Sequence, residues 1–378
     1  MEPYVKGKFS PEEYGYFDLY LKITPILTLF YTFKSEILIV SAKSNKIIEF
    51  LKSSLNQAFF TFICFLIISL ILNNKIFLYS VIGAYFFSTI AITTIYFIKK
   101  GYNIRTAFQK PIRRLFEIFS LLLIMKLSIE FSESLIISSL VGLFVSSSFM
   151  LSKFGKEELK YFINIKLNRE FFSQFFRLKG IFFSELLNIV SLSFLTLFVF
   201  SNYSSREMGF LELSNKFISV PQLVFSSVVG LIIQNRIGSL FSEAKPILSY
   251  IKKIFFFLLT ISIIICGFYL IFIEYIIDIL FVSEWRSSAS FVILLLPHLF
   301  FYSIFSPLSR VLYGMNSEKN LKNWQLLKSF IVFSTSFFYW LDVSKYLIVY
   351  SVFSSISYLV LLCFLRKEIL DYERKLIL

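Results

Sequence analysis

Charged residues, cysteine and histidine are all scarce in this chain. Only 16% of its 378 residues are charged and 57% are hydrophobic, whereas soluble domains have roughly 25% charged residues. The cysteines Cys64, Cys266 and Cys363 stand far apart in apolar stretches. This spacing excludes a disulfide framework or a zinc site and indicates small core residues. With His298 as the single histidine, the chain has few side chains suited to acid–base catalysis. The composition therefore excludes a water-soluble domain.

Long apolar blocks dominate instead, at the length an α-helix needs to cross a hydrocarbon core of about 30 Å. Continuous runs such as FFTFICFLIISLIL (59–72) favour helices over the alternating strands of a barrel. The predicted fold class is all-α, a polytopic bundle of about eleven transmembrane helices. Trp285, Trp324 and Trp340 lie at predicted span ends, where amphipathic rings prefer the headgroup layer. The predicted spans are 17–41, 55–72, 76–98, 114–129, 134–152, 180–201, 209–234, 254–280, 288–309, 324–341 and 346–365.

The net charge of +14 does not indicate a nucleic-acid partner, because the lysines and arginines are segregated by connector. Such alternation is the positive-inside pattern of membrane proteins, so the basic connectors are predicted to be cytoplasmic. The N-terminus is then expected outside and the C-terminus inside. The basic connectors lie around 43–52, 99–114, 153–179, 236–253, 310–328 and 366–375.

One short segment occurs twice. Residues 12–22 read EEYGYFDLYLK, and 194 positions later residues 206–216 read REMGFLELSNK. The offset aligns acidic, glycine and lysine positions, and both copies lead from an outside loop into a predicted span. Matching charges inside spans favour a true duplication over chance, as in transporters built from two parallel halves.

The duplication also predicts the domain organisation. The second copy follows a complete span, 180–201, whereas the first follows only MEPYVKGKFSP, so a plan of six plus six helices lacks its first helix here. We expect an N-terminal lobe at 1–152, a cytoplasmic amphipathic linker at 153–179 and a C-terminal lobe at 180–378. In the linker, aromatic and basic residues alternate at helical spacing, as expected for a helix lying on anionic lipid.

Several stretches resemble the polysaccharide biosynthesis proteins, the O-antigen flippases of the multidrug/oligosaccharidyl-lipid/polysaccharide (MOP) exporter superfamily. The resemblance runs from residue 10 to about 330 and rests on the order and spacing of its motifs. In one of them the usual glycine is Ser283, while Trp285 and Ala289 are kept. The motifs are FSPEEYGYFDLY, YTFKSEILIVSAKSNKIIEFLKSSL, REMGFLELSNKFISVPQLVFSSVVGLI, LFVSEWRSSASFVILLLP and FSPLSRVLYGMNSEKNLK.

The resemblance implies a multi-pass protein of the bacterial cytoplasmic membrane, with two lobes around a cavity that opens alternately to each side. Its cargo would be an oligosaccharide on polyprenyl diphosphate, moved outward for O-antigen, lipopolysaccharide or capsule assembly. The implied partners are this lipid-linked oligosaccharide, membrane lipids and glycan polymerase machinery. No cofactor is implied beyond coupling to Na⁺ or H⁺. Such cargo needs polar and cationic groups around a wet cavity, because a diphosphate cannot cross hydrocarbon unaided.

Charged residues inside the predicted spans supply candidates for these groups. Asp18 and Lys22, like Glu212 and Lys216, are spaced i, i+4 and can pair within the membrane. Two interpretations stay open: they line the cavity, or they neutralise each other near the outer interface, where lysine snorkels easily.

The remaining candidates are single residues. At 100° per residue Glu36 falls on the same helix face as Asp18. Because no basic residue stands four positions before or after it, Glu36 is the best candidate for ion coupling. Glu185 is the second candidate. Lys34 is expected on the opposite face, although the family motif places a cation at this position. Arg177 in the linker is a secondary candidate for the diphosphate. His298 is expected to hydrogen-bond a neighbouring helix rather than relay protons.

Three alternatives stay open. A cation-coupled multidrug exporter of the same superfamily would also use buried carboxylates. A membrane glycan-assembly enzyme such as a polymerase is less favoured, since the outer connectors are short and nucleotide motifs are absent; we therefore expect no enzyme. The product would be inactive if the missing helix were essential.

Overall fold

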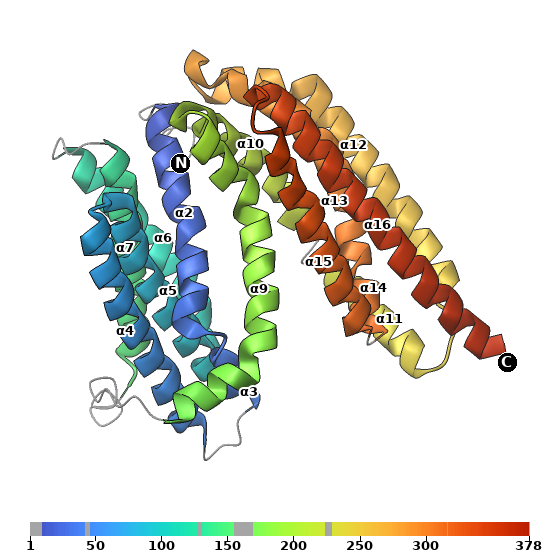
Figure 1. Ribbon diagram of the computed structural model, residues 1–378, viewed down its shortest axis with the longest axis horizontal. Helices are drawn as coiled ribbons and strands as arrows, with labels where there is room; N and C mark the ends of the chain where they lie inside the picture. Colours follow the sequence, from blue (N-terminus) through green and yellow to red (C-terminus); the bar gives the residue numbers. More distant parts are fainter. Residues whose placement is uncertain are drawn as a thin grey trace. The chain divides into compact units, whose positions relative to one another are not determined.

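The computed structural model describes residues 10–41, 46–126, 131–154, 169–223, 229–315 and 317–377. Within these ranges every regular element is helical, and Figure 1 shows the helices as long rods joined by short connections. The chain forms two compact units. The first unit is Tyr16–Val190, and the second is Ser191–Leu378 together with Met1–Gly15.

The first unit is built from α2 (Pro11–Thr32) after its opening turn, and from five further helices before α9 (Arg169–Asn202). Helices α4 and α5 pack side by side, as do α6 and α7. Their core is apolar, and a buried bond from the Tyr31 hydroxyl to the Val81 carbonyl (3.1 Å) ties α2 to α5. The five helices are α3 (Glu36–Ser41), α4 (Ile47–Leu72), α5 (Lys75–Lys99), α6 (Asn103–Lys126) and α7 (Phe131–Leu151).

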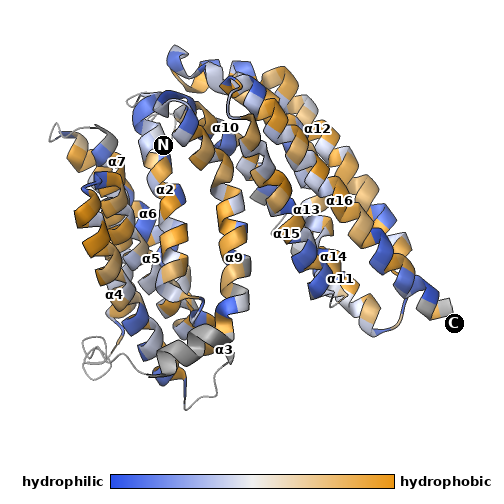
Figure 2. Cartoon of the chain, in the orientation of Figure 1, coloured by the Kyte–Doolittle hydropathy of each residue, from blue (hydrophilic) through white to orange (hydrophobic). Residues whose placement is uncertain are grey.

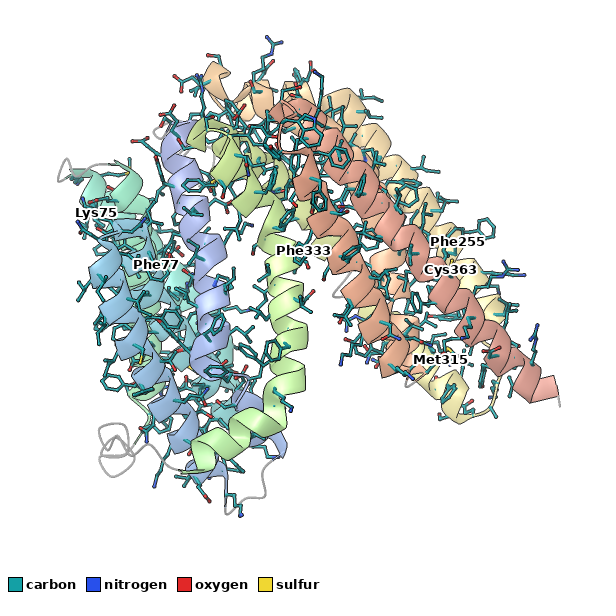
Figure 3. The ribbon with its side chains drawn as sticks, viewed as in Figure 1. Lys75, Phe77, Phe255, Met315, Phe333 and Cys363 are labelled. Atoms are coloured by element: carbon teal, nitrogen blue, oxygen red, sulfur yellow. The ribbon has the colours of Figure 1, made fainter. Side chains whose placement is uncertain are left out.

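The second unit contains the C-terminal part of α9 and seven further helices. Its core lies among α11, α13, α14, α15 and α16, where the Trp324 indole donates to the Ser357 carbonyl (2.9 Å). Phe333 of α15 packs against Phe194 of α9, with ring centroids 5.1 Å apart (Figure 3). The seven helices are α10 (Ser205–Leu223), α11 (Gly230–Ser242), α12 (Leu248–Leu280), α13 (Ser287–Leu308), α14 (Arg310–Gly314), α15 (Glu318–Ser334) and α16 (Val343–Ile377).

The polytopic helical bundle predicted from the sequence is confirmed. Seven helical segments in the described residues are long and apolar enough to cross a membrane. The other four predicted spans fall on α2 with α3, on α6, on α10 with α11, and on α15, which are broken or carry more polar residues. The seven segments are Ile47–Leu72, Lys75–Lys99, Glu133–Leu151, Leu178–Asn202, Leu248–Leu280, Ser283–Gly314 and Val343–Arg374.

The outer faces of these helices are as apolar as their packed faces. Figure 2 shows hydrophobic residues along the length of α4 and α12, and side chains such as Ile71 and Ile271 are exposed there. This corrects the expectation that the cysteines are core residues. Cys64 and Cys363 are exposed and Cys266 is half-buried. Cys363 is labelled in Figure 3. The error arose because lipid, unlike water, accepts small apolar side chains on the outer surface.

The predicted division into 1–152, 153–179 and 180–378 stays a prediction. Residues 155–168 of the predicted linker lie outside the described residues, and α9 begins at Arg169.

Replacing Glu373 with alanine is expected to destabilise the second unit. One Glu373 carboxylate oxygen accepts from the Ile247 (2.8 Å) and Leu248 (2.9 Å) backbone N–H groups, and so caps the start of α12 from the distant α16. Loss of such a cap costs about 1 kcal/mol. Thermal unfolding of the purified protein in detergent measures the loss. Asp371→Ala, an exposed acid on the same helix, is the control and should leave the transition unchanged.

Candidate functional site

The repeated segment builds two helix starts of the same construction. At the start of α2 the Ser10 N–H donates to the Glu13 carboxylate (2.8 Å), and the Glu13 N–H donates to the Ser10 hydroxyl (3.3 Å). At the start of α10, Ser204 and Glu207 make the same two bonds, at 2.9 and 3.2 Å. Each is a capping box that satisfies N–H groups left open by the first helical turn.

The two helix starts cross at their glycines, within the second unit. A Cβ atom on Gly15 would collide with the Ser205 carbonyl oxygen, and one on Gly209 would collide with the Pro11 carbonyl oxygen. Pro11 and Ser205 are themselves related by the offset of 194, so the crossing is symmetric. Glycine is required at both positions because the two backbones touch. The repeat therefore encodes a contact between its own two copies.

One buried ring covers this crossing. The Trp285 side chain is fully buried. It meets the rings of Tyr14 (5.9 Å between centroids, edge-on) and Phe210 (6.3 Å, edge-on). The tryptophan kept in the family-like motif thus packs against both copies of the repeat, at the start of the candidate span Ser283–Gly314.

Each copy then places an acid and a lysine one turn apart. The Lys22 ammonium lies 3.7 Å from the Asp18 carboxylate, and the Lys216 ammonium lies 3.4 Å from the Glu212 carboxylate. Asp18 is only 1% exposed and Glu212 only 4%. Lys216 also donates to the Tyr14 hydroxyl (2.6 Å). Both carboxylates are thus covered by protein, while the two lysines are partly exposed.

A break between α2 and α3 forms a second charged group, in the first unit. Phe33 and Lys34 adopt left-handed backbone conformations (φ 45° and 60°), which are unusual for residues other than glycine. The turn brings the Lys34 ammonium within 3.9 Å of Glu36 and 3.4 Å of Glu185. The expected placement of Lys34 opposite Glu36 is therefore wrong, since it assumed one continuous helix through residue 36.

Replacing Glu36 with glutamine is expected to reduce transport more than replacing Lys34 with glutamine. Only the carboxylate can take up and release H⁺ or Na⁺, whereas Lys34 supplies the charge beside it. Transport by the two variants at equal protein level measures the ranking. Glu274→Gln, an exposed acid on α12, is the control. Wild-type transport by both Glu36→Gln and Lys34→Gln would reject the ranking.

A cationic group with aromatic neighbours lies among α13, α15 and α16. The Lys328 ammonium is 5.0 Å from the centre of the Tyr358 ring and 5.6 Å from that of Trp324. The His298 ring lies 6.0 Å from the Tyr358 ring. His298 and Tyr358 stand near the middle of the candidate spans Ser283–Gly314 and Val343–Arg374, so Lys328 lies beside the central part of two candidate spans.

In the described part of the chain no carboxylate comes within ion-pair distance of Lys328. The charge pattern counted Lys328 with a basic connector predicted to be cytoplasmic, and the structure places Lys328 within α15, which begins ten residues earlier, at Glu318. Because the residues before Trp324 are polar, the sequence did not indicate that a helix begins there and already contributes to the core.

His298 bonds to neighbouring helices, as expected from the sequence. Its Nε2 lies 3.4 Å from the Gln222 amide nitrogen of α10, and its backbone N–H donates to the Ser351 hydroxyl (3.0 Å) of α16. Its Nδ1 atom is buried, with no hydrogen-bond partner among the described residues.

The fold of the chain is similar to that of several solved structures. The chain superimposes on a multidrug resistance MATE family transporter of the MOP superfamily in an inward-facing conformation, with a TM-score of 0.75 and 12% identity over 98% of this chain and 93% of that one. It also superimposes on the lipid II flippase MurJ in an inward closed conformation, with a TM-score of 0.68 and 16% identity over 99% of this chain and 87% of that one. The chain has the fold of MATE transporters and of MurJ.

A third structure with the MATE fold is a MOP superfamily transporter from Pyrococcus furiosus, described as having a binding pocket of reversed polarity. It matches with a TM-score of 0.57 and 13% identity over 98% of this chain and 91% of that one. No family model matches the sequence, and a comparison with curated proteins gives no match.

Within this MATE-like fold the predicted site residues fall into three groups. Asp18 with Lys22 and Glu212 with Lys216 form two equivalent pairs, and Lys34, Glu36 and Glu185 form the group at the helix break. Arg177 lies in α9, and its side chain is outside what the structure describes. Lys328 with His298 is the group that sequence reasoning did not assemble.

Proposed function

We propose that the chain is a flippase that moves oligosaccharide units linked to polyprenyl diphosphate across the membrane, for O-antigen, capsule or exopolysaccharide assembly. The fold it shares with transporters, among them a lipid II flippase, supports transport rather than catalysis. The choice of cargo rests on the charges inside the helices.

The observation that carries the proposal is the unneutralised Lys328. The buried acids Asp18 and Glu212 each have a lysine of their own within 4 Å, and Glu36 shares Lys34 with Glu185. Lys328 has no such partner in the described part of the chain, which leaves an excess positive charge deep in the helices. A cation there attracts a diphosphate or an acidic sugar and disfavours a cationic drug.

The second candidate is a cation-coupled multidrug exporter. The MATE structures support it as strongly as MurJ supports the first, and the same buried carboxylates suit a cationic drug. We expect coupling to H⁺ or Na⁺ through Glu36 in either case.

Complementation separates the two candidates. The gene is expressed in a strain that lacks its own O-antigen flippase, and both surface polysaccharide and resistance to cationic drugs are measured. Restored surface polysaccharide without added resistance supports the flippase. Added resistance with no surface polysaccharide, while the protein is present in the membrane, overturns the proposal in favour of the exporter.

A further inference from the structure

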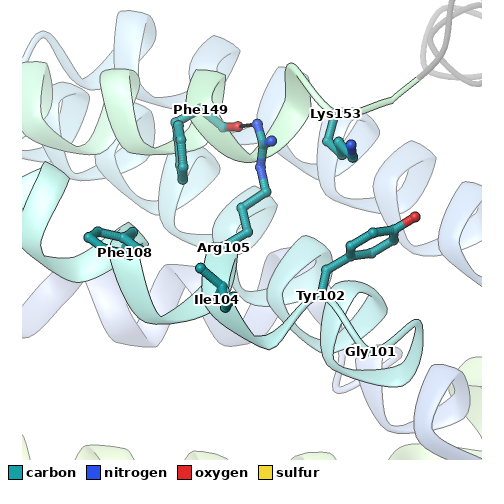
Figure 4. A pocket seen from close by; sticks show the side chains of 7 residues that line it. All are labelled: Gly101, Tyr102, Ile104, Arg105, Phe108, Phe149 and Lys153. Carbon is teal, nitrogen blue, oxygen red and sulfur yellow. Dashed lines mark hydrogen bonds between the residues drawn. The ribbon is translucent and has the colours of Figure 1, made fainter.

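A pocket with two cationic side chains opens in the first unit where α5 turns into α6. Its volume is about 570 Å³, and it is lined by Gly101, Tyr102, Ile104, Arg105, Phe108, Phe149 and Lys153 (Figure 4). The pocket lies at a connector that the charge pattern assigns to the cytoplasmic side. It uses none of the residues on which the proposed function rests.

A tight turn creates the pocket. Helix α5 ends at Lys99, and Gly101 takes a left-handed conformation (φ 82°) in which its N–H bonds to the Ile98 carbonyl (3.0 Å). The next N–H, that of Tyr102, bonds to the Phe97 carbonyl (2.8 Å). Glycine meets no steric penalty in this conformation. The turn directs the first residues of α6 toward the end of α7.

The guanidinium of Arg105 is held in a fixed position. It donates to the Phe149 carbonyl and to the Ser152 hydroxyl, and it stacks on the Phe149 ring at 4.4 Å from the ring centre (Figure 4). Arginine has five N–H donors, so these contacts leave some of them for a ligand. A cation anchored in this way loses little side-chain entropy when it binds an anion.

The second cation comes from the end of α7. The Lys153 ammonium lies 5.6 Å from the centre of the Tyr102 ring, and its side chain is exposed. In the described residues neither Arg105 nor Lys153 has a carboxylate within ion-pair distance. Two unneutralised cations at one apolar-walled pocket suit a phosphate group.

The surface that continues from the pocket identifies the source of the phosphate. On α6, Ile104 is 77% exposed and Phe108 58%, and Leu115, Phe119 and Leu122 are also exposed. At 100° per residue these five side chains fall within about 60° of one another, in one stripe along the helix. A free phosphate would make no use of an apolar stripe, whereas acyl chains would lie along it.

We propose that this pocket binds the headgroup phosphate of an anionic phospholipid, whose acyl chains run along the exposed stripe of α6. The Arg105 guanidinium and the Lys153 ammonium hold the phosphate, and Ile104 and Phe108 meet the first part of the acyl chains. Bound lipid of this kind would fasten the end of α7 to α6 at the membrane surface.

Native mass spectrometry of the full chain, released from detergent, tests the proposal. The protein is titrated with phosphatidylglycerol and, separately, with phosphatidylcholine of the same acyl chains. We expect tighter binding of phosphatidylglycerol, and a loss of about fivefold in that binding for Lys153→Gln, since each cation near an anionic lipid contributes about that factor. Lys110→Gln, an exposed cation on α6 outside the pocket, should bind like the wild type.

Three outcomes would overturn the proposal. Equal binding of the two lipids would show that the headgroup charge is not recognised. Wild-type binding by Lys153→Gln and by the double variant Arg105→Gln/Lys153→Gln would place the lipid elsewhere. Displacement of the lipid by glycerol 3-phosphate alone would identify a free-phosphate site. The Lys153 variant keeps the test valid if loss of Arg105 disturbs folding, because Lys153 donates no hydrogen bond to any of the described residues.

Discussion

Replacing Gly209 with alanine lowers the free energy of unfolding by about 1–3 kcal/mol, the usual cost of overpacking a close contact. The new Cβ would overlap the Pro11 carbonyl oxygen, and a backbone atom cannot rotate away as a side chain can. The two helix starts must therefore move apart, which also loosens the packing of Trp285 over the crossing. Thermal and denaturant unfolding of the purified protein in detergent measures the loss.

Gly267→Ala is the matched control, because a Cβ on this α12 glycine meets no atom within 4 Å. Alanine in a helix interior is favoured over glycine by about 0.5–1 kcal/mol, so this variant should be slightly more stable than the wild type. The two substitutions are chemically identical and should have opposite signs. A Gly209→Ala protein as stable as the wild type would contradict the glycine contact.

The symmetry of the crossing adds a second expectation. Gly15→Ala should destabilise the protein as Gly209→Ala does, through the Ser205 carbonyl. The double variant should cost less than the sum of the two single variants, because helices already pushed apart by one methyl group accommodate the other. Strict additivity would indicate two independent contacts rather than one shared crossing.

Local patterns were enough to predict much of the fold. The long apolar runs identify the spans, and the offset of 194 identifies two helix starts that share a capping box, a glycine and an acid–lysine pair. These features depend on residues within a few turns of each other, so they can be deduced from spacing. The contacts of Gly15 and Gly209 could not be deduced, because each glycine packs against the other copy of the repeat.

Two errors show what spacing does not reveal. The break at Phe33 and Lys34 contains no glycine or proline, so nothing in the sequence indicates that α2 ends at Thr32. The placement of Lys34 opposite Glu36 was therefore wrong. Trp324 suggested a membrane interface, but its indole is bonded to Ser357 inside the core, beside Lys328. That site is made by three separate helices, α13, α15 and α16, and only their packing brings it together.

Replacing Lys328 with methionine is expected to lower transport of a lipid-linked anionic cargo by about tenfold or more. A charge-assisted bond to phosphate or carboxylate is worth about 1.4 kcal/mol or more, and tenfold in affinity corresponds to about 1.4 kcal/mol. Methionine fills a similar space and leaves no polar atom unpaired, so folding should be preserved. Surface polysaccharide in the flippase-deficient strain, divided by the amount of protein in the membrane, measures the effect.

Two further variants establish that charge is the cause. Lys328→Glu should abolish transport, because it places a negative charge where the cargo's own negative charge must lie. Lys322→Met, which removes an exposed lysine from the same helix, should transport like the wild type. Should Lys328→Met keep full transport, or Lys328→Glu improve export of a cationic drug, the cargo is not anionic. The excess positive charge beside His298 would then have a structural role only.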